Sequence, residues 1–142
     1  MNDQERKFRE TRSRVDAYQK TDVMTANRET ILLMMYSAAI RFLKQAIEAT
    51  DKGDLQEKAR LITRTQEIVN ELRASLNFQV GGDLAVHLDR LYSYITNQLI
   101  QGNLAKNADV LNGALSILCS LNEAWEQAIA VVRKERGRVE KT

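Results

Sequence analysis

Residues 31–47 are the most apolar stretch of the chain, with thirteen apolar side chains in seventeen positions. A helix that buries only one face needs an apolar stripe a little over about 100° wide. At 100° per residue this segment fills a broader sector. The central stripe consists of Leu32, Met35, Ala39, Phe42, Leu43 and Ala46, with Ile31, Met34 and Ala38 on one side and Leu33 and Ile40 on the other. A helix this apolar either oligomerises or receives a partner.

The remaining composition predicts an all-α chain. There is no proline among the 142 residues and there are only six glycines. The periodic segments are rich in Leu, Ala, Glu, Gln, Arg and Lys, which lose little rotamer freedom in a helix. At 16.2 kDa the chain is long enough to bury a core of its own, so we expect a single domain.

Turn and cap signals divide the chain into four helical segments. We expect helices over about 27–50, 54–76, 83–102 and 107–132, with Asp54 and Asp83 as N-caps. The paired glycines Gly81 and Gly82 supply the backbone freedom of a tight reversal, and Gly102 is expected to close the third helix. Because short turns join antiparallel neighbours, we expect an antiparallel up-down-up-down four-helix bundle.

Each of the last three segments has its own apolar stripe. In the second these are Leu55, Ala59, Ile62, Val69, Leu72 and Leu76, and in the third Leu84, Leu88, Leu91, Tyr92, Ile95 and Leu99. In the fourth they are Val110, Leu111, Ala114, Leu118, Leu121, Trp125, Ala128, Ile129 and Val132, and Ile117, Ala124 and Val131 form an additional shoulder. The rings of Trp125 and Tyr92 are expected to fill the core. The fourth helix therefore also has more apolar width than one core requires.

Charge separates the two ends of the chain from its centre. Residues 1–20 have six basic and four acidic side chains, 131–142 have five and two, and 21–130 have ten and thirteen. We expect residues 1–26 to be a mobile N-terminal arm, 27–132 to be the bundle, and 133–142 to be a basic tail that frays. A nucleic-acid adaptor that uses the basic ends is one function to consider.

The residues needed for metal, cofactor or covalent chemistry are scarce. His87 is the only histidine and Cys119 the only cysteine, and neither a Glu-x-x-His pair nor a Gly-rich phosphate loop occurs. We expect no cofactor, no metal and no enzymatic activity. The first twenty residues contain no continuous apolar run, and no segment has about 20 uninterrupted apolar residues, so we expect a cytoplasmic protein without membrane insertion.

Three stretches in this order resemble the flagellar secretion chaperone family, FliS, over about residues 18–129. The first joins Tyr18 and residues 23–27 to 33–36 and 39–43, the second joins 76–77 and 81–85 to 91–94, and the third comprises Asn103, Asp109, Leu111, Leu118, Leu121, Ala124 and Trp125. Two positions depart from the family pattern. Asn27-Arg28 stands where the family usually has Ser-Pro, and Ser37-Ala38 where it has Asp-Gly. Asn is an equally good cap, whereas the methyl group of Ala38 bears on partner preference.

The resemblance implies a cytoplasmic, non-enzymatic chaperone that binds the disordered C-terminal segment of flagellin along the apolar surface of the bundle. Binding would prevent premature polymerisation, and the loaded chaperone would dock at the export gate of the flagellar secretion apparatus. The resemblance also implies that the arm around Tyr18 covers part of this surface in the free protein.

Client binding or arm docking is expected at the surplus apolar positions and at the apolar points of the arm. The candidates are Tyr18, Val23, Ile31, Met34, Ala38, Ile117, Ala124 and Val131. The alternative for the helical positions is that they widen the core or meet a symmetry mate, as in a homo-oligomeric scaffold or adaptor without a flagellin client. A chaperone should be a monomer or a weak homo-oligomer without its client, whereas a scaffold should stay oligomeric.

Overall fold

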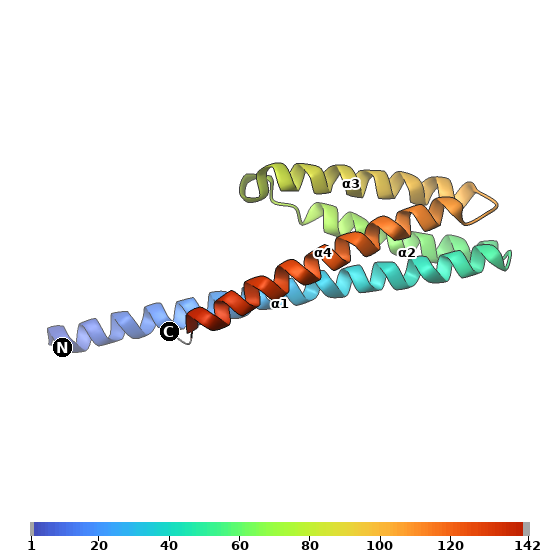
Figure 1. Ribbon diagram of the computed structural model, residues 1–142. Coiled ribbons are helices and arrows are strands. Elements are labelled where there is room, and N and C mark those ends of the chain that lie inside the picture. The colour runs from blue at the N-terminus through green and yellow to red at the C-terminus, as the bar shows by residue number, and fades with distance from the viewer. Residues whose placement is uncertain (1, 141–142) are drawn as a thin grey trace. The chain divides into compact units, whose positions relative to one another are not determined.

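The computed structural model describes residues 2–140, and the regular secondary structure in this range consists of α-helices joined by short turns. The side chains of residues 15–19, 21, 22 and 140 are outside the description. Four helices follow one another: α1 (Asp3–Asp51), α2 (Leu55–Ala74), α3 (Phe78–Leu104) and α4 (Asp109–Glu140) (Figure 1). The all-α fold class is confirmed.

The start of the first helix differs from the expectation, since α1 begins at Asp3 and not near Asn27. The amide of Glu5 donates to Asn2 Oδ1, which caps the helix. The chain divides into two compact units, residues 1–32 and 33–142. The expected start of the first helix near Asn27 is therefore wrong, whereas the mobility of residues 1–26 remains a prediction.

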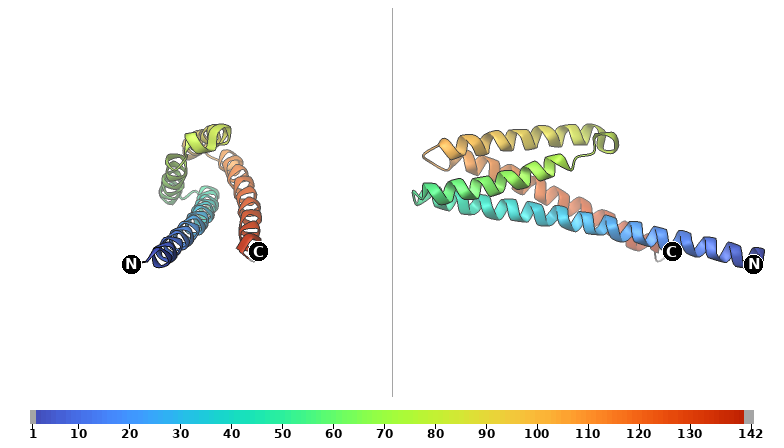
Figure 2. Two further views of the ribbon diagram at one scale, coloured as in Figure 1. Left: turned by 90° about the vertical axis from the view of Figure 1, so that its left-hand side faces the viewer. Right: turned by 180° about the vertical axis from the view of Figure 1, so that it is seen from behind.

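In the second unit, the end of α1 packs with α2, α3 and α4. Successive helices run in opposite directions and lie next to one another in chain order (Figures 1 and 2). The turn between α1 and α2 agrees with the sequence signals: Gly53 has a φ of 72°, and the carboxylate of Asp54 accepts the Glu57 amide at 3.1 Å. The predicted Asp54 cap is confirmed.

The turn between α2 and α3 differs in its details from the prediction. The side chain of Asn77, and not of Asp83, caps α3, because Asn77 Oδ1 accepts the amides of Gln79 and Val80. After one helical turn the backbone kinks at Gly82, with φ 51° and ψ −126°. The reversal does require glycine here, since residues with a Cβ rarely adopt this φ.

The C-terminal ends of α3 and α4 also differ from the expectation. Gly102 lies inside α3 and is buried, and the helix ends at Leu104. Its missing Cβ makes room for Leu111, whose Cδ2 would lie 2.3 Å from a methyl group at this position. Helix α4 continues to Glu140, so most of the tail that was expected to fray is helical.

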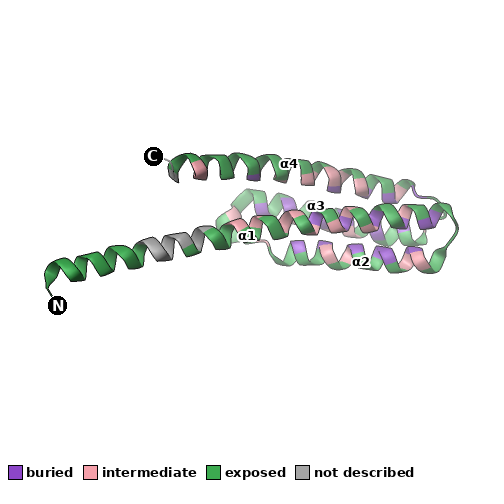
Figure 3. Cartoon of the chain, turned by 90° about the horizontal axis from the view of Figure 1, so that it is seen from below, coloured by how far each residue is buried: buried purple, intermediate pink, exposed green. Residues whose placement is uncertain are grey.

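The core occupies the sides of the helices that face one another (Figure 3). Its apolar members are Tyr36, Ala39, Leu43, Ala46 and Ala49 of α1, Leu61, Ile62, Val69 and Leu72 of α2, Ala85, Leu88, Tyr92, Ile95 and Leu99 of α3, and Ala108, Leu111, Ala114, Leu118 and Ile129 on and before α4. Four residues expected in the core, Leu55, Leu84, Ala128 and Val132, are instead exposed. Small residues such as Ala85 and Gly102 take interior positions because they allow the helices to approach closely.

Among the described residues, one segment, Val23–Asp51 of α1, is long and apolar enough by length and composition to cross a membrane, with a mean hydropathy of 1.2. A core helix passes the same test. Because Tyr36, Ala39 and Leu43 are completely buried in the bundle, we assign the second half of α1 to the core.

Candidate partner-binding surfaces

A buried polar cluster joins three helices of the bundle. The hydroxyls of Tyr36 in α1 and Tyr92 in α3 are hydrogen-bonded at 2.5 Å, and Trp125 Nε1 of α4 donates to the Tyr36 hydroxyl at 3.2 Å. Burial raises the pKa of both tyrosines, because the charged phenolate is poorly solvated in the interior. The cluster thus remains neutral and fixes α1, α3 and α4 against one another.

The expected core positions of the rings are confirmed for Tyr92, which is buried, and hold in part for Trp125, which is half-buried. Tyr94 is half exposed, and its hydroxyl accepts a hydrogen bond from Gln98 Nε2 at 2.5 Å.

On α1, the exposed apolar side chain in the second unit is Met34, with 64% of its surface accessible. Ala38, one turn later, is half-buried. Met35, which was expected in the core, is half-buried on the side toward α2. Of the surplus apolar positions of this helix in the second unit, Met34 is thus exposed, whereas Leu33, Ala38 and Ile40 are half-buried.

The three apolar residues of the α4 shoulder differ in how far they are exposed. Ile117 is half-buried, Ala124 is exposed, and Val131 has 63% of its surface accessible. These positions follow one another at intervals of seven residues, so they lie along one side of the helix. None of the three belongs to the buried core.

The two shoulders lie on separate parts of the bundle surface. A shallow depression of about 360 Å³ between α1 and α4 is lined by Asn122 of α4 and by Ser37, Ile40, Arg41, Lys44, Gln45 and Glu48 of α1. Ile117 precedes Asn122 by five residues and therefore points about 140° away around the helix. The α4 shoulder thus faces away from this seam, and none of the candidate residues lines it.

Three candidates belong to the first unit. Val23 and Ile31 are more than half exposed. The side chain of Tyr18 lies outside the described residues.

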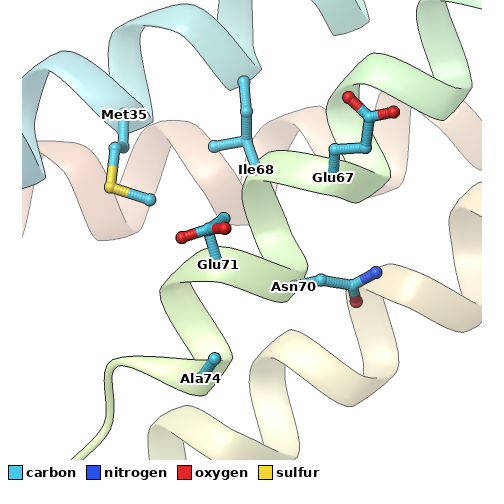
Figure 4. Close-up of a pocket in the computed structure, with 6 residues that line it drawn as sticks. All are labelled: Met35, Glu67, Ile68, Asn70, Glu71 and Ala74. Carbon is cyan, nitrogen blue, oxygen red and sulfur yellow. The ribbon is translucent and has the colours of Figure 1, made fainter.

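A depression of about 840 Å³ lies between α1 and α2 and was not anticipated from the sequence (Figure 4). It is lined by Met35 of α1 and by Glu67, Ile68, Asn70, Glu71 and Ala74 of α2. The signal that could have indicated it was Ile68, an apolar residue off the core stripe of its helix. Met35 and Ile68 supply an apolar floor, and the two glutamates bring negative charge.

The described residues contain no group of three or more His, Cys, Asp or Glu side chains that could hold a metal ion. His87 is exposed, and Cys119 is a half-buried free thiol. What the described surface offers a partner is apolar and charged area.

Comparison with known proteins identifies the family. The family model described as "Flagellar protein FliS" matches residues 11–132. The Flagellar secretion chaperone FliS of Bacillus subtilis is 29% identical over 84% of this chain and 89% of its own length. The FliS proteins of Vibrio cholerae and Salmonella typhimurium are each 30% identical over 82% of this chain and 88% and 90% of their own lengths.

A solved structure has the same fold. It is described as a crystal structure of a flagellar chaperone from bacteria, and it superposes with a TM-score of 0.70 at 23% identity, covering 82% of this chain and 97% of its own. Taken together with the helical bundle and its exposed apolar shoulders, these matches show that the chain belongs to the FliS family of flagellar secretion chaperones.

Proposed function

We propose that this chaperone binds the C-terminal segment of flagellin in the cytoplasm, prevents premature polymerisation, and delivers the client to the export gate of the flagellar secretion apparatus. The observation that carries the proposal is the exposed apolar surface on α1 and α4, above all Met34, in a member of this family. Enzymatic chemistry has no part in the proposal.

The binding mode follows from the shape of the surface. An amphipathic client helix can lay its apolar face on apolar side chains of the bundle. Ordering a disordered segment costs roughly 2–5 kcal/mol of the gross interaction energy, so a tight complex needs a large contact area. Separate shoulders on α1 and α4 would supply it if the client reaches around the bundle. The flexible thioether of Met34 suits a surface that adapts to its client.

The first 26 residues have a proposed role as a cover. Residues 1–26 would shield part of the client surface through Tyr18 and Val23, residues 27–132 would form the client-binding domain, and the basic residues 133–142 would remain solvated. Removing residues 1–24 should then increase binding of an apolar dye and tighten client binding. Unchanged dye binding together with an unchanged dissociation constant would exclude a cover.

Calorimetry with the C-terminal flagellin segment of the same bacterium tests the central proposal. We expect a one-to-one complex with a negative heat-capacity change, as apolar burial requires. Met34→Glu and Ile117→Glu should weaken binding while circular dichroism stays unchanged, because a carboxylate under a client helix loses its water.

Leu104→Glu is the matched control, because Leu104 is a well-exposed apolar residue outside the proposed surface. This variant should bind the client as the unmodified protein does. Absence of binding at tens of micromolar to every flagellin of the organism would refute the proposed function. A stable oligomer that ignores flagellin would favour the scaffold alternative.

A further inference from the structure

We propose that the depression between α1 and α2 holds one helix of the client, and that this helix has basic side chains that pair with Glu67 and Glu71. The inference rests on the proposed function, because it assigns a place and a charge pattern to part of the same client.

The shape of the depression fits the side of a helix. Figure 4 shows Met35 of α1 and Ile68 of α2 directed toward the space between the two helices, where they form the apolar floor. Ala74 extends the depression at the C-terminal end of α2. Ala38 follows Met35 by one turn, so the depression adjoins the candidate client surface of α1.

The acidic side chains of α2 at this depression favour an occupant with positive charge. Glu67 and Glu71 are four residues apart on one face of the helix, an arrangement of like charges that destabilises a helix on its own. The only described ion pair of Glu67 is a 3.8 Å contact with Arg64, and Glu71 has none in the described part of the chain. Arg73, the basic residue that follows Glu71 in α2, is already paired with Asp89 of α3 at 2.6 Å.

Both glutamates are therefore available to a partner at the same apolar depression. A helix that presents apolar side chains to Met35 and Ile68, and Lys or Arg side chains at its margin, would complement both the floor and the charges. Basic residues three or four positions apart would match the spacing of the two carboxylates. The acidic pair then has a binding role that outweighs its small cost to α2.

Charge reversal at Glu71 separates this role from a structural one. Glu71→Lys should weaken binding of the C-terminal flagellin segment about tenfold, because it replaces an attraction with a repulsion. The same change places Lys four residues after Glu67, which favours the helix. The melting temperature of the free protein should therefore stay the same or rise while affinity falls.

Glu123→Lys is the matched control, since it makes the same change in net charge at an exposed position of α4. Its affinity should stay within about twofold of the unmodified protein, because Glu123 does not line the depression and exposed charges are screened by salt. Between about 0.1 M and about 0.5 M NaCl the unmodified protein should lose affinity, and Glu71→Lys should lose less. Glu67→Gln provides a second variant that should lower the salt dependence.

The outcomes distinguish a wrong assignment of the depression from a wrong proposed function. If the flagellin segment binds the unmodified protein and Glu71→Lys equally well, with the same salt dependence, the assignment of this depression is wrong and the proposed function stands. If the segment does not bind the unmodified protein, both are wrong. A loss that is equal in Glu71→Lys and Glu123→Lys would reflect net charge alone and would also overturn the assignment.

Discussion

The tyrosine cluster makes an asymmetric prediction about stability. The Tyr36 hydroxyl lies at its centre, bonded to both Trp125 Nε1 and the Tyr92 hydroxyl. Tyr36→Phe removes both hydrogen bonds and leaves the buried Tyr92 hydroxyl and the Trp125 N–H without their partner. Tyr92→Phe removes one bond, and the contact between Tyr36 and Trp125 remains.

The magnitudes follow from the cost of orphaned polar groups. A typical hydrogen bond contributes about 1 kcal/mol net, whereas a buried polar group without a partner costs about 1–3 kcal/mol. We expect Tyr92→Phe to lower the free energy of unfolding by about 1 kcal/mol and Tyr36→Phe by about 2–4 kcal/mol. The double variant should be no less stable than Tyr36→Phe alone, because it also removes the orphaned Tyr92 hydroxyl.

Urea unfolding followed by far-ultraviolet circular dichroism measures these differences. Trp125 is the only tryptophan, so its fluorescence gives a second probe at the cluster itself. Coincident transitions would support two-state unfolding. Equal effects of the two single variants, or additive effects in the double variant, would refute the reasoning, because either result means that the hydroxyls act independently.

Three further predictions concern other features of the bundle. Because burial raises the pKa of Tyr36 and Tyr92, these two hydroxyls lose their protons at a lower pH in the unfolded chain than in the folded one. The free energy of unfolding should therefore fall above about pH 10, by up to about 1.4 kcal/mol per pH unit for each tyrosine. Denaturation midpoints measured against pH, and repeated with Tyr92→Phe, give the slope. Gly102→Ala should destabilise the protein by about 1–3 kcal/mol through the clash with Leu111, whereas Gly113→Ala, which meets open space in α4, should raise the melting temperature. Lys58 is buried and donates to the Ala105 carbonyl at 2.6 Å, so Lys58→Met should cost about 1–3 kcal/mol in the same unfolding assay; a stability equal to that of the unmodified protein would show that this bond contributes nothing net.

The sequence predicts helices and their turns where local signals act alone. The turn at Gly53 and the Asp54 cap depend on a positive φ and on a side chain that accepts a nearby amide, and both are short-range. The extension of α1 to Asp3 is also local, since residues 3–26 contain neither glycine nor proline. The low apolar content of this stretch led to the wrong expectation, because a helix does not need an apolar stripe at every turn to form.

The core was predicted less well because periodicity does not fix which helix edge faces its neighbour. In α1 the buried stripe is centred on Tyr36, Ala39 and Leu43, so it is rotated away from the expected Met35 and Phe42. This orientation brings Tyr36 into hydrogen-bonding contact with Tyr92 and Trp125, a contact across the bundle that no local pattern contains.

The exposure of the candidate positions was predicted only in part, since Ala38 and Ile117 are half-buried, and their arrangement was not predicted. Excess apolar width correctly indicated that Met34 and Val131 lie outside the core. Whether two such positions share a groove depends on how the helices pack, and the seam between α1 and α4 is lined by other residues. The depression beside Ile68 likewise arises from two helices together.

The packing of the bundle is consistent with the proposed binding of a disordered client segment. Tyr36 ties α1 to α3 and α4, so the helices that present the apolar shoulders are held in place by contacts inside the bundle and not by the shoulders themselves. A surface that is already arranged loses little conformational entropy when the client binds, and the ordering cost falls mainly on the client. Residues such as Met34 can therefore remain exposed in the free protein, because the fold does not depend on burying them.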